Sequence, residues 1–309
     1  MYPIHKIDRL RAEDIEYLGT KRKFWFTMEG RRYLFKAEER GTGEDWAEKV
    51  VCELAQLLGI PSIEYDLAHE FEGQTAIQPG VICPTIVPRP LTLVLGNQLL
   101  LVADPAYPAQ EDRKYGVREY TVDAVAEIVS ILQPPAPDWM RTAPAGVTTA
   151  LGVFIGYMML DAWVANQDRH HQNWGAILEI SPELSLRLAP TFDHGASLAR
   201  NLSDEERRDR LTTRDRGRSV EFFAGRARSG FYASSKDNKT MLAVDVFRKF
   251  AERDQTATRM WLEKLAEISQ IAVDEILANI PPQRMSPVAR EFTLKLLMIN
   301  RLRLLEGLE

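Results

Sequence analysis

Apolar residues recur along the first part of the chain with two different periods. Residues 24–28 and 32–36 are short strand-like runs, and residues 29–31 between them, Glu-Gly-Arg, carry glycine where a tight turn needs it. Residues 43–61 then repeat apolar side chains at helical spacing, and Gly59 is typical of a helix end. The pattern therefore predicts a β-hairpin followed by an amphipathic helix.

The next part of the chain mixes strand and turn patterns. Residues 81–88 indicate a strand that runs into a linker. Residues 91–95 and 98–102 are apolar runs separated by Gly96-Asn97, and such a pair favours a two-residue turn, so we expect these runs to form a hairpin. Residues 122–132 have the spacing of a short amphipathic helix.

The centre of the chain is the most apolar. Residues 147–163 are apolar on almost every side, which predicts a buried helix ending near Ala165. A polar loop follows, and then residues 174–178 and 186–192 indicate two strands joined by a turn at residues 181–183. We therefore expect a buried helix, a loop and a hairpin in that order.

The last third is divided between a charged segment and helices. Residues 200–218 hold seven arginines and five acidic residues with almost no apolar periodicity. They fit either a mobile activation loop or a solvated helical face, and both interpretations stay open. Residues 244–309 repeat apolar residues at helical spacing, and Ser286 before Pro287 indicates a helix start.

Three polar residues in the central region have intervals that suit phosphoryl transfer. Asp168 lies in the loop after the buried helix, Asn173 follows five residues later, and Asp193 opens an Asp-His-Gly segment after the hairpin. The reaction needs a base that takes the acceptor proton and oxygen ligands for Mg²⁺. The Asp-to-Asn interval alone is near chance, so its weight comes from the order of helix, loop, hairpin and Asp-x-Gly.

Neighbouring residues admit other interpretations. His170 and His171 could ligate a metal, but no third nitrogen or sulfur ligand has the spacing of a tetrahedral zinc site, so we expect His170 to bond the loop backbone. Arg169 is expected to orient a phosphate or an acidic neighbour, and Trp174 to lie in the core.

The motif Asn-x-Asp-Arg-His-x-x-Asn-Trp-Gly, which starts at Asn166, resembles the HipA-like serine/threonine kinases, as does the downstream Pro-x-Phe-Asp-His-Gly-x-Ser-Leu. The Asp-Arg-His order is also similar to the phosphatidylinositol kinases. The resemblance implies a short member without the N-terminal subdomain and an α+β, bilobal protein-kinase-like fold. It further implies ATP and Mg²⁺ as cofactors, Asp168 as catalytic base, and Asn173 and Asp193 as magnesium ligands.

Such a kinase requires a phosphate-binding lysine upstream, paired with a glutamate on a helix. Lys36 ends the second strand of the N-terminal hairpin, and Glu48 and Glu53 lie on the helix that follows. By comparison with HipA-like kinases, Glu48 matches the glutamate position and Glu53 does not. An exposed lysine at a strand end is the alternative interpretation of Lys36.

The loop before the hairpin departs from the glycine-rich loop of protein kinases. Gly19 is followed by Thr20 and Lys21, and these could offer backbone N–H groups and a cation to phosphates. Some HipA-like kinases are switched off by phosphorylation of a loop serine. We therefore predict that a phosphate on Thr20 would repel ATP.

Composition and charge add expectations about the compartment and the partners of the protein. The 309 residues are 45% hydrophobic, carry a formal net charge of −5 and include two distant cysteines. We expect one core shared by an N-lobe, residues 1–90, and a C-lobe, residues 91–309. The sequence shows no leader and no long uncharged span, so we expect a cytoplasmic protein that binds neither membrane nor nucleic acid.

Three functions remain open at this stage. The first is a kinase that modifies serine or threonine on a protein substrate, and the family resemblance implies that it could be a toxin held by an inhibitory antitoxin partner. The second keeps the fold and transfers phosphate to a lipid or small-molecule hydroxyl. The third is a nucleotide-binding pseudokinase, although the residues needed for turnover are all present.

Overall fold

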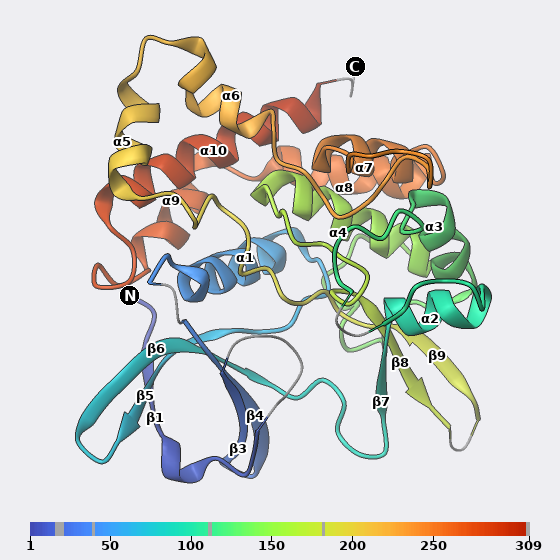
Figure 1. Ribbon diagram of the computed structural model, residues 1–309, viewed down its shortest axis with the longest axis horizontal. Coiled ribbons are helices and arrows are strands. Elements are labelled where there is room, and N and C mark those ends of the chain that lie inside the picture. Colours follow the sequence, from blue (N-terminus) through green and yellow to red (C-terminus); the bar gives the residue numbers. More distant parts are fainter. Residues whose placement is uncertain (16–21, 39–40, 111–112, 181–182, 307–309) are drawn as a thin grey trace.

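Two β-sheets lie on one side of the molecule and most of its helices lie on the other (Figure 1). The computed structural model describes residues 1–15, 22–38, 41–110, 113–180 and 183–306. The predicted α+β class is confirmed, with a β-rich N-terminal part and a mainly helical C-terminal part.

The larger sheet has six strands in the order β1-β5-β6-β4-β3-β2. The predicted hairpin is confirmed as β3 and β4, whose turn residues Glu29 and Gly30 have φ values of 53° and 74°. Positive φ at both positions gives a turn whose twist matches the strands. Phe24, Phe26 and Phe35 are buried inside this sheet. The strands are β1 (Ile4–Asp8), β2 (Asp14–Ile15), β3 (Lys23–Met28), β4 (Arg31–Ala37), β5 (Asp66–Glu72) and β6 (Thr75–Pro84).

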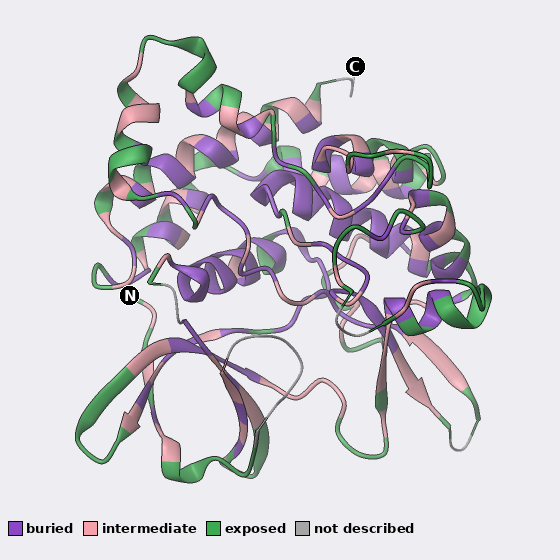
Figure 2. Ribbon diagram, viewed as in Figure 1, coloured by how far each residue is buried: buried purple, intermediate pink, exposed green. Residues whose placement is uncertain are grey.

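Helix α1 (Glu44–Leu58) lies between this sheet and the other helices (Figure 1). It is buried on nearly every side, as Figure 2 shows, because its apolar residues join one core cluster with the central helix of the chain. The helix ends at Gly59, as predicted, with φ at 75°. A Cβ at Gly59 would lie 2.1 Å from the Thr142 carbonyl oxygen, so close packing also requires glycine there.

The hairpin predicted over residues 91–102 is wrong. Residues 92–95 form strand β7 (Thr92–Leu95), but Gly96 begins helix α2 (Gly96–Ala103). Two non-local contacts override the turn signal, because β7 pairs with β8 (Gly175–Glu179) and the Asn97 N–H donates to the His171 carbonyl at 2.8 Å. A Cβ on Gly96 would meet the Trp174 ring, so this glycine permits close packing and makes no turn.

The central helix α4 (Ala150–Val164) is confirmed as a buried helix, and it ends at Ala165 with φ at 54°. The hairpin after it is confirmed as β8 and β9 (Ser185–Leu188), which complete a three-stranded sheet with β7. Trp174 is buried, as expected for a core residue.

Other helices surround α4 and complete the C-terminal part (Figure 1). Ser286 caps the last and longest of them, as predicted, by accepting a hydrogen bond from the Ala289 N–H. The α-helices are α3 (Val122–Ile131), α5 (Asp204–Thr212), α6 (Val220–Ala224), α7 (Ala243–Ala251), α8 (Gln255–Glu267), α9 (Gln270–Ala278) and α10 (Pro287–Leu305). Within the described ranges, no helix combines the length and the apolar character that crossing a membrane requires.

The charged segment of residues 200–218 is largely an ordered helix. Ser203 and Glu206 form a capping box at the start of α5. Apart from Arg207, the residues of this helix are exposed or half-buried. This favours the solvated helical face over the mobile activation loop. Arg200, before the helix, is partly buried and contacts α1.

Candidate active site

The loop after α4 is shaped by its own polar side chains. The Asp168 N–H donates to Asn166 Oδ1 at 3.1 Å, and Asn173 Nδ2 donates to the Asp168 carbonyl at 2.7 Å. Asn166 Nδ2 in turn donates to Asp161 Oδ1 on α4 at 2.8 Å. These bonds place Asp168 and Asn173 side by side at the end of the buried helix.

The side chain of Arg169 connects this loop to α4 and to Thr191. Its fully buried guanidinium donates to both carboxylate oxygens of Asp161, at 2.6 and 2.9 Å, and to Thr191 Oγ1 at 2.9 Å. Burial alone would lower the pKa of Arg169, but the charge of Asp161 raises it, so the guanidinium stays charged. Arg169 also lies 3.1 Å from His194 Nε2, beside Asp193. The expectation that Arg169 orients an acidic neighbour is met by Asp161.

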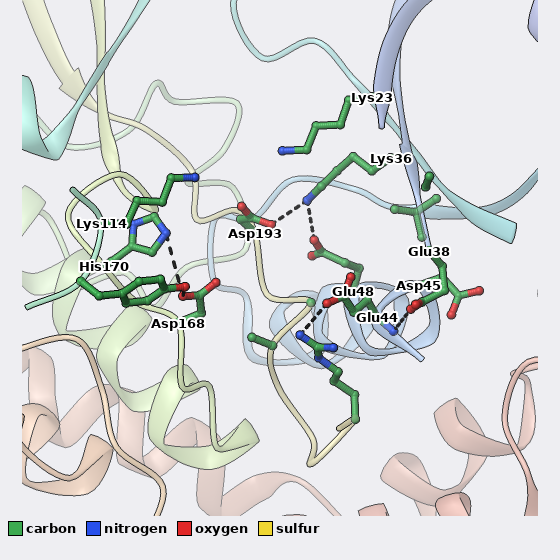
Figure 3. A pocket seen from close by; sticks show the side chains of 16 residues that line it. Lys23, Lys36, Glu38, Glu44, Asp45, Glu48, Lys114, Asp168, His170 and Asp193 are labelled. Carbon is green, nitrogen blue, oxygen red and sulfur yellow. Dashed lines mark hydrogen bonds and ion pairs between the residues drawn. The ribbon is translucent and has the colours of Figure 1, made fainter. Parts of the chain in front are cut away.

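Lys36 joins the two parts of the molecule. Its Nζ lies 2.6 Å from Glu48 Oε1 and 2.7 Å from Asp193 Oδ1 (Figure 3). The other Glu48 oxygen accepts the His194 N–H at 2.9 Å. Glu53 instead pairs with Lys49 at 2.7 Å. The structure thus brings Lys36, Glu48 and Asp193 together and leaves Glu53 outside the cluster.

The charges in this cluster depend on one another. Burial alone would lower the pKa of Lys36, but the carboxylates of Asp193 and Glu48 raise it well above its usual value. Burial raises the pKa of Glu48, and the charge of Lys36 opposes that shift. Lys36 is therefore an ammonium ion held by two acids, which excludes the exposed strand-end lysine of the alternative interpretation.

Two adjoining cavities meet at this cluster. One has a volume of about 320 Å³ and is lined mainly by charged residues, among them Asp168, Glu48 and Arg200 (Figure 3). The other has a volume of about 200 Å³ and is largely apolar. Lys36 and Asp193 line both. The apolar walls come from Trp25, Leu34, Ile63, Cys83, Ile86 and Phe192.

The two histidines of the loop are neutral. Burial lowers the pKa of His170 and of His171 to about 4. His170 Nδ1 accepts the Gln172 N–H at 3.1 Å, so it bonds the loop backbone as predicted, and His171 Nδ1 lies 2.9 Å from the Tyr107 hydroxyl. Among the residues that the structure describes, no cluster of three or more His, Cys, Asp or Glu side chains could hold a metal ion.

The donor set nevertheless fits a magnesium ion bound together with phosphate. Asn173 uses Nδ2 for the Asp168 carbonyl, so its amide oxygen takes no part in that bond. The Asp193 side chain is 37% exposed and faces the cavity (Figure 3). Hard oxygen ligands of this kind suit Mg²⁺, which takes few protein ligands when phosphates supply the others.

Several site residues lacked a sequence signal, and three predicted ones lie outside the described residues. Tyr115 and Lys114 line the charged cavity from the segment between α2 and α3, although no local pattern marked them. Asp161 could have been found, because a lone acid in a buried apolar helix requires a buried partner. The predicted phosphate-binding residues Gly19, Thr20 and Lys21 fall within the undescribed residues 16–21.

Comparison with known proteins places the fold. No protein-family model matches the sequence, and no curated protein matches it. The proinflammatory kinase CtkA of Helicobacter pylori is similar over 98% of this chain and 99% of its own, with a TM-score of 0.64 and 18% identity. HipA of Shewanella oneidensis MR-1, solved with HipB and operator DNA, is similar over 94% of this chain and 64% of its own, with a TM-score of 0.56 and 12% identity. The chain therefore has the bilobal fold of HipA-like kinases, as predicted.

Proposed function

We propose that the protein is an ATP- and Mg²⁺-dependent phosphotransferase. The observation that carries the proposal is Lys36, which lies between Glu48 and Asp193 in a cavity that also contains Asp168. A kinase needs these same groups, a lysine for the phosphates, a glutamate that fixes it, a metal-binding aspartate and a base. The likeness of the fold to two kinases supports the proposal.

The two cavities suggest how the nucleotide binds. The apolar cavity, of about 200 Å³, suits the adenine ring, and the charged cavity suits the phosphates. Lys36 contributes to both walls and would hold the phosphates, while Asn173 and Asp193 would hold Mg²⁺. The bound ion neutralises charge on the phosphate oxygens.

Asp168 would act on the acceptor. Its carboxylate lines the charged cavity and would accept the proton of the acceptor hydroxyl as the oxygen bonds to the γ-phosphorus and ADP leaves. The neutral His170 beside it, 3.9 Å away, adds no charge that competes for the carboxylate at neutral pH. Hydrogen bonds of the Asp168 backbone, which form when the protein folds, would hold this base in position.

The proposal extends to the kind of molecule that receives the phosphate. We infer serine or threonine of a protein, with a toxin–antitoxin role and an inhibitory partner, from the likeness to HipA, which was solved with HipB. Comparison of phosphorylated proteins in cells that express wild type or Asp168→Asn would identify the acceptor. A phosphate that appears only on small molecules would contradict a protein acceptor.

Asp168→Asn and Asp193→Asn test the reaction itself. Both should slow ADP release at least about 100-fold, since each removes a group that acts in the transition state. Asp138→Asn, an exposed acid paired with Arg141, is the matched control and should leave the rate unchanged. If Asp193→Asn releases ADP as fast as the wild type, the proposal is wrong. An inactive wild type that Mg²⁺-ATP stabilises against heat would instead indicate a pseudokinase.

A further inference from the structure

A tyrosine hydroxyl contacts the candidate base. Tyr115 Oη donates a hydrogen bond to Asp168 Oδ1 at 2.6 Å. This length is typical of a hydroxyl bound to a charged carboxylate. The Tyr115 ring also lies edge-on to His170, with centroids 5.6 Å apart and planes at 87°.

The chain around Tyr115 is anchored on one side. Val117 and Tyr120 are buried, and the Tyr120 ring stacks on Phe231 with centroids 4.2 Å apart. Gly116 has φ at 71°, a conformation that favours glycine and turns the chain directly after Tyr115. Tyr115 itself is 66% exposed. The buried residues Val117 and Tyr120 therefore hold this segment in place, while the solvent-accessible phenol of Tyr115 contacts Asp168. The phenol can move away from Asp168 without disturbing the core.

The phenol occupies the position that the reaction assigns to an acceptor. A base that deprotonates an acceptor hydroxyl must lie within about 2.6–3.2 Å of it. Tyr115, Asp168, Lys36 and Asp193 all line the charged cavity of about 320 Å³. The Tyr115 hydroxyl, the proposed base and the proposed phosphate-binding groups thus line one cavity. Lys114, the next residue along the chain, lines the same cavity and adds positive charge.

We propose that Tyr115 is an intramolecular phosphate acceptor of this enzyme, which rests on the proposed phosphotransferase function. Tyr115 Oη bonds to the γ-phosphorus of ATP, the bond from that phosphorus to the bridging oxygen breaks, and ADP leaves. The phenolic proton passes to Asp168. Once Asp168 has released this proton to solvent, a phosphate with a charge of about −2 lies beside its carboxylate, so the two groups repel each other. The modified ring then leaves Asp168, and the base becomes accessible to an external acceptor.

Peptide mapping by mass spectrometry tests this proposal on the full chain. Incubation with Mg²⁺-ATP should place one phosphate on Tyr115, with a first-order rate constant that stays the same over a tenfold dilution of enzyme. Tyr115→Phe should abolish that phosphate. Tyr33→Phe, which removes a hydroxyl from β4 outside both cavities, should retain it. Asp168→Asn should slow its appearance at least about 100-fold.

Three outcomes would overturn it. ADP release or phosphate on other residues, with Tyr115 unmodified, would refute the Tyr115 proposal and leave the phosphotransferase intact. A rate constant that falls with dilution would refute transfer within one molecule. Neither ADP release nor phosphate on any residue would refute the phosphotransferase and the Tyr115 proposal together.

Discussion

The two sides of the candidate site are held in different ways. On the side of the loop that carries Asp168, Arg169 is buried and binds Asp161 and Thr191 within the same part of the chain. On the α1 side, Lys36 reaches a residue of the other part, Asp193, which lies 157 positions away in the sequence. Asp168, the proposed base, is therefore positioned by contacts within the C-terminal part. Lys36, the proposed phosphate-binding lysine, is positioned only when the two parts meet.

Removal of Asp161 should give the largest effect on the side of the Asp168 loop. Asp161→Ala leaves the buried Arg169 guanidinium without its counter-charge, and we expect a loss of about 3–5 kcal/mol in the free energy of unfolding. Urea denaturation at pH 7 measures this loss. The control, Asp138→Ala, breaks an exposed pair with Arg141 and should cost less than about 1 kcal/mol. Equal losses in the two variants would contradict a buried ion pair beneath the site.

The two histidines of the Asp168 loop should make the free energy of unfolding fall in acid. His170 and His171 have folded-state pKa values of about 4, so below pH 6.5 the unfolded chain binds more protons than the folded one. Stability should fall as the pH drops from 6.5 to about 4, by up to about 1.4 kcal/mol per pH unit for each histidine. Asp45, whose pKa burial raises to about 6, titrates in the opposite direction and offsets part of this loss.

Urea denaturation at pH 7, 6 and 5 measures that slope. The double variant His170→Gln/His171→Gln should lose less stability per pH unit than wild type, by an amount that approaches two protons. A double variant with the wild-type slope would show that these two rings are protonated in the folded protein.

Local patterns were enough to predict the elements that carry the site. The turn at Gly30, the helix end at Gly59 and the buried helix ending near Ala165 all depend on residues within a few positions of one another. Asp193 was placed correctly after a hairpin for the same reason. Backbone preference and apolar period decide such features locally, so the sequence alone indicates them.

Contacts between distant segments could not be predicted in this way. Gly96-Asn97 has a strong local turn signal, yet its backbone N–H groups bond to residues 171 and 174, and a helix begins there. Tyr115 meets Asp168 across 53 positions, and no periodicity connects two loops. Arg200 likewise reaches α1 across more than a hundred positions. Tertiary contacts override weak local preferences, and they are visible only when the chain is folded.

On the α1 side, two glutamates of one helix allow a matched test. Glu48→Gln removes the charge that fixes Lys36, and a charge-assisted hydrogen bond is worth about 1.5–3 kcal/mol, so kcat/KM for ATP should fall about 10- to 150-fold. Glu53→Gln breaks the partly exposed pair with Lys49, away from Lys36, and should change kcat/KM less than about threefold. Equal effects of the two variants would show that Lys36 needs no partner on α1.

The smallest expected effect comes from a second link between α1 and the segment after Asp193. Arg200 Nη2 lies 2.5 Å from Glu44 Oε1, and Arg200 Nη1 donates to Thr42 Oγ1 at 3.0 Å. Glu44 precedes Glu48 by one helical turn, so this pair aligns the same helix face. Arg200→Gln and Glu44→Gln should each raise the KM for ATP about threefold.

A double-mutant cycle on that KM separates alignment from direct contact with the nucleotide. If Arg200 acts through Glu44, the double variant should be no worse than either single one, with a coupling of about 0.6 kcal/mol, which is the threefold effect of one variant. If Arg200 instead binds the phosphates from the charged cavity, which it also lines, the two effects should add. Additive effects would mean that Arg200 binds the nucleotide directly and does not act through Glu44. The contacts of Lys36 with Asp193 and of Glu48 with the His194 N–H would then align α1 with the segment that carries Asp193.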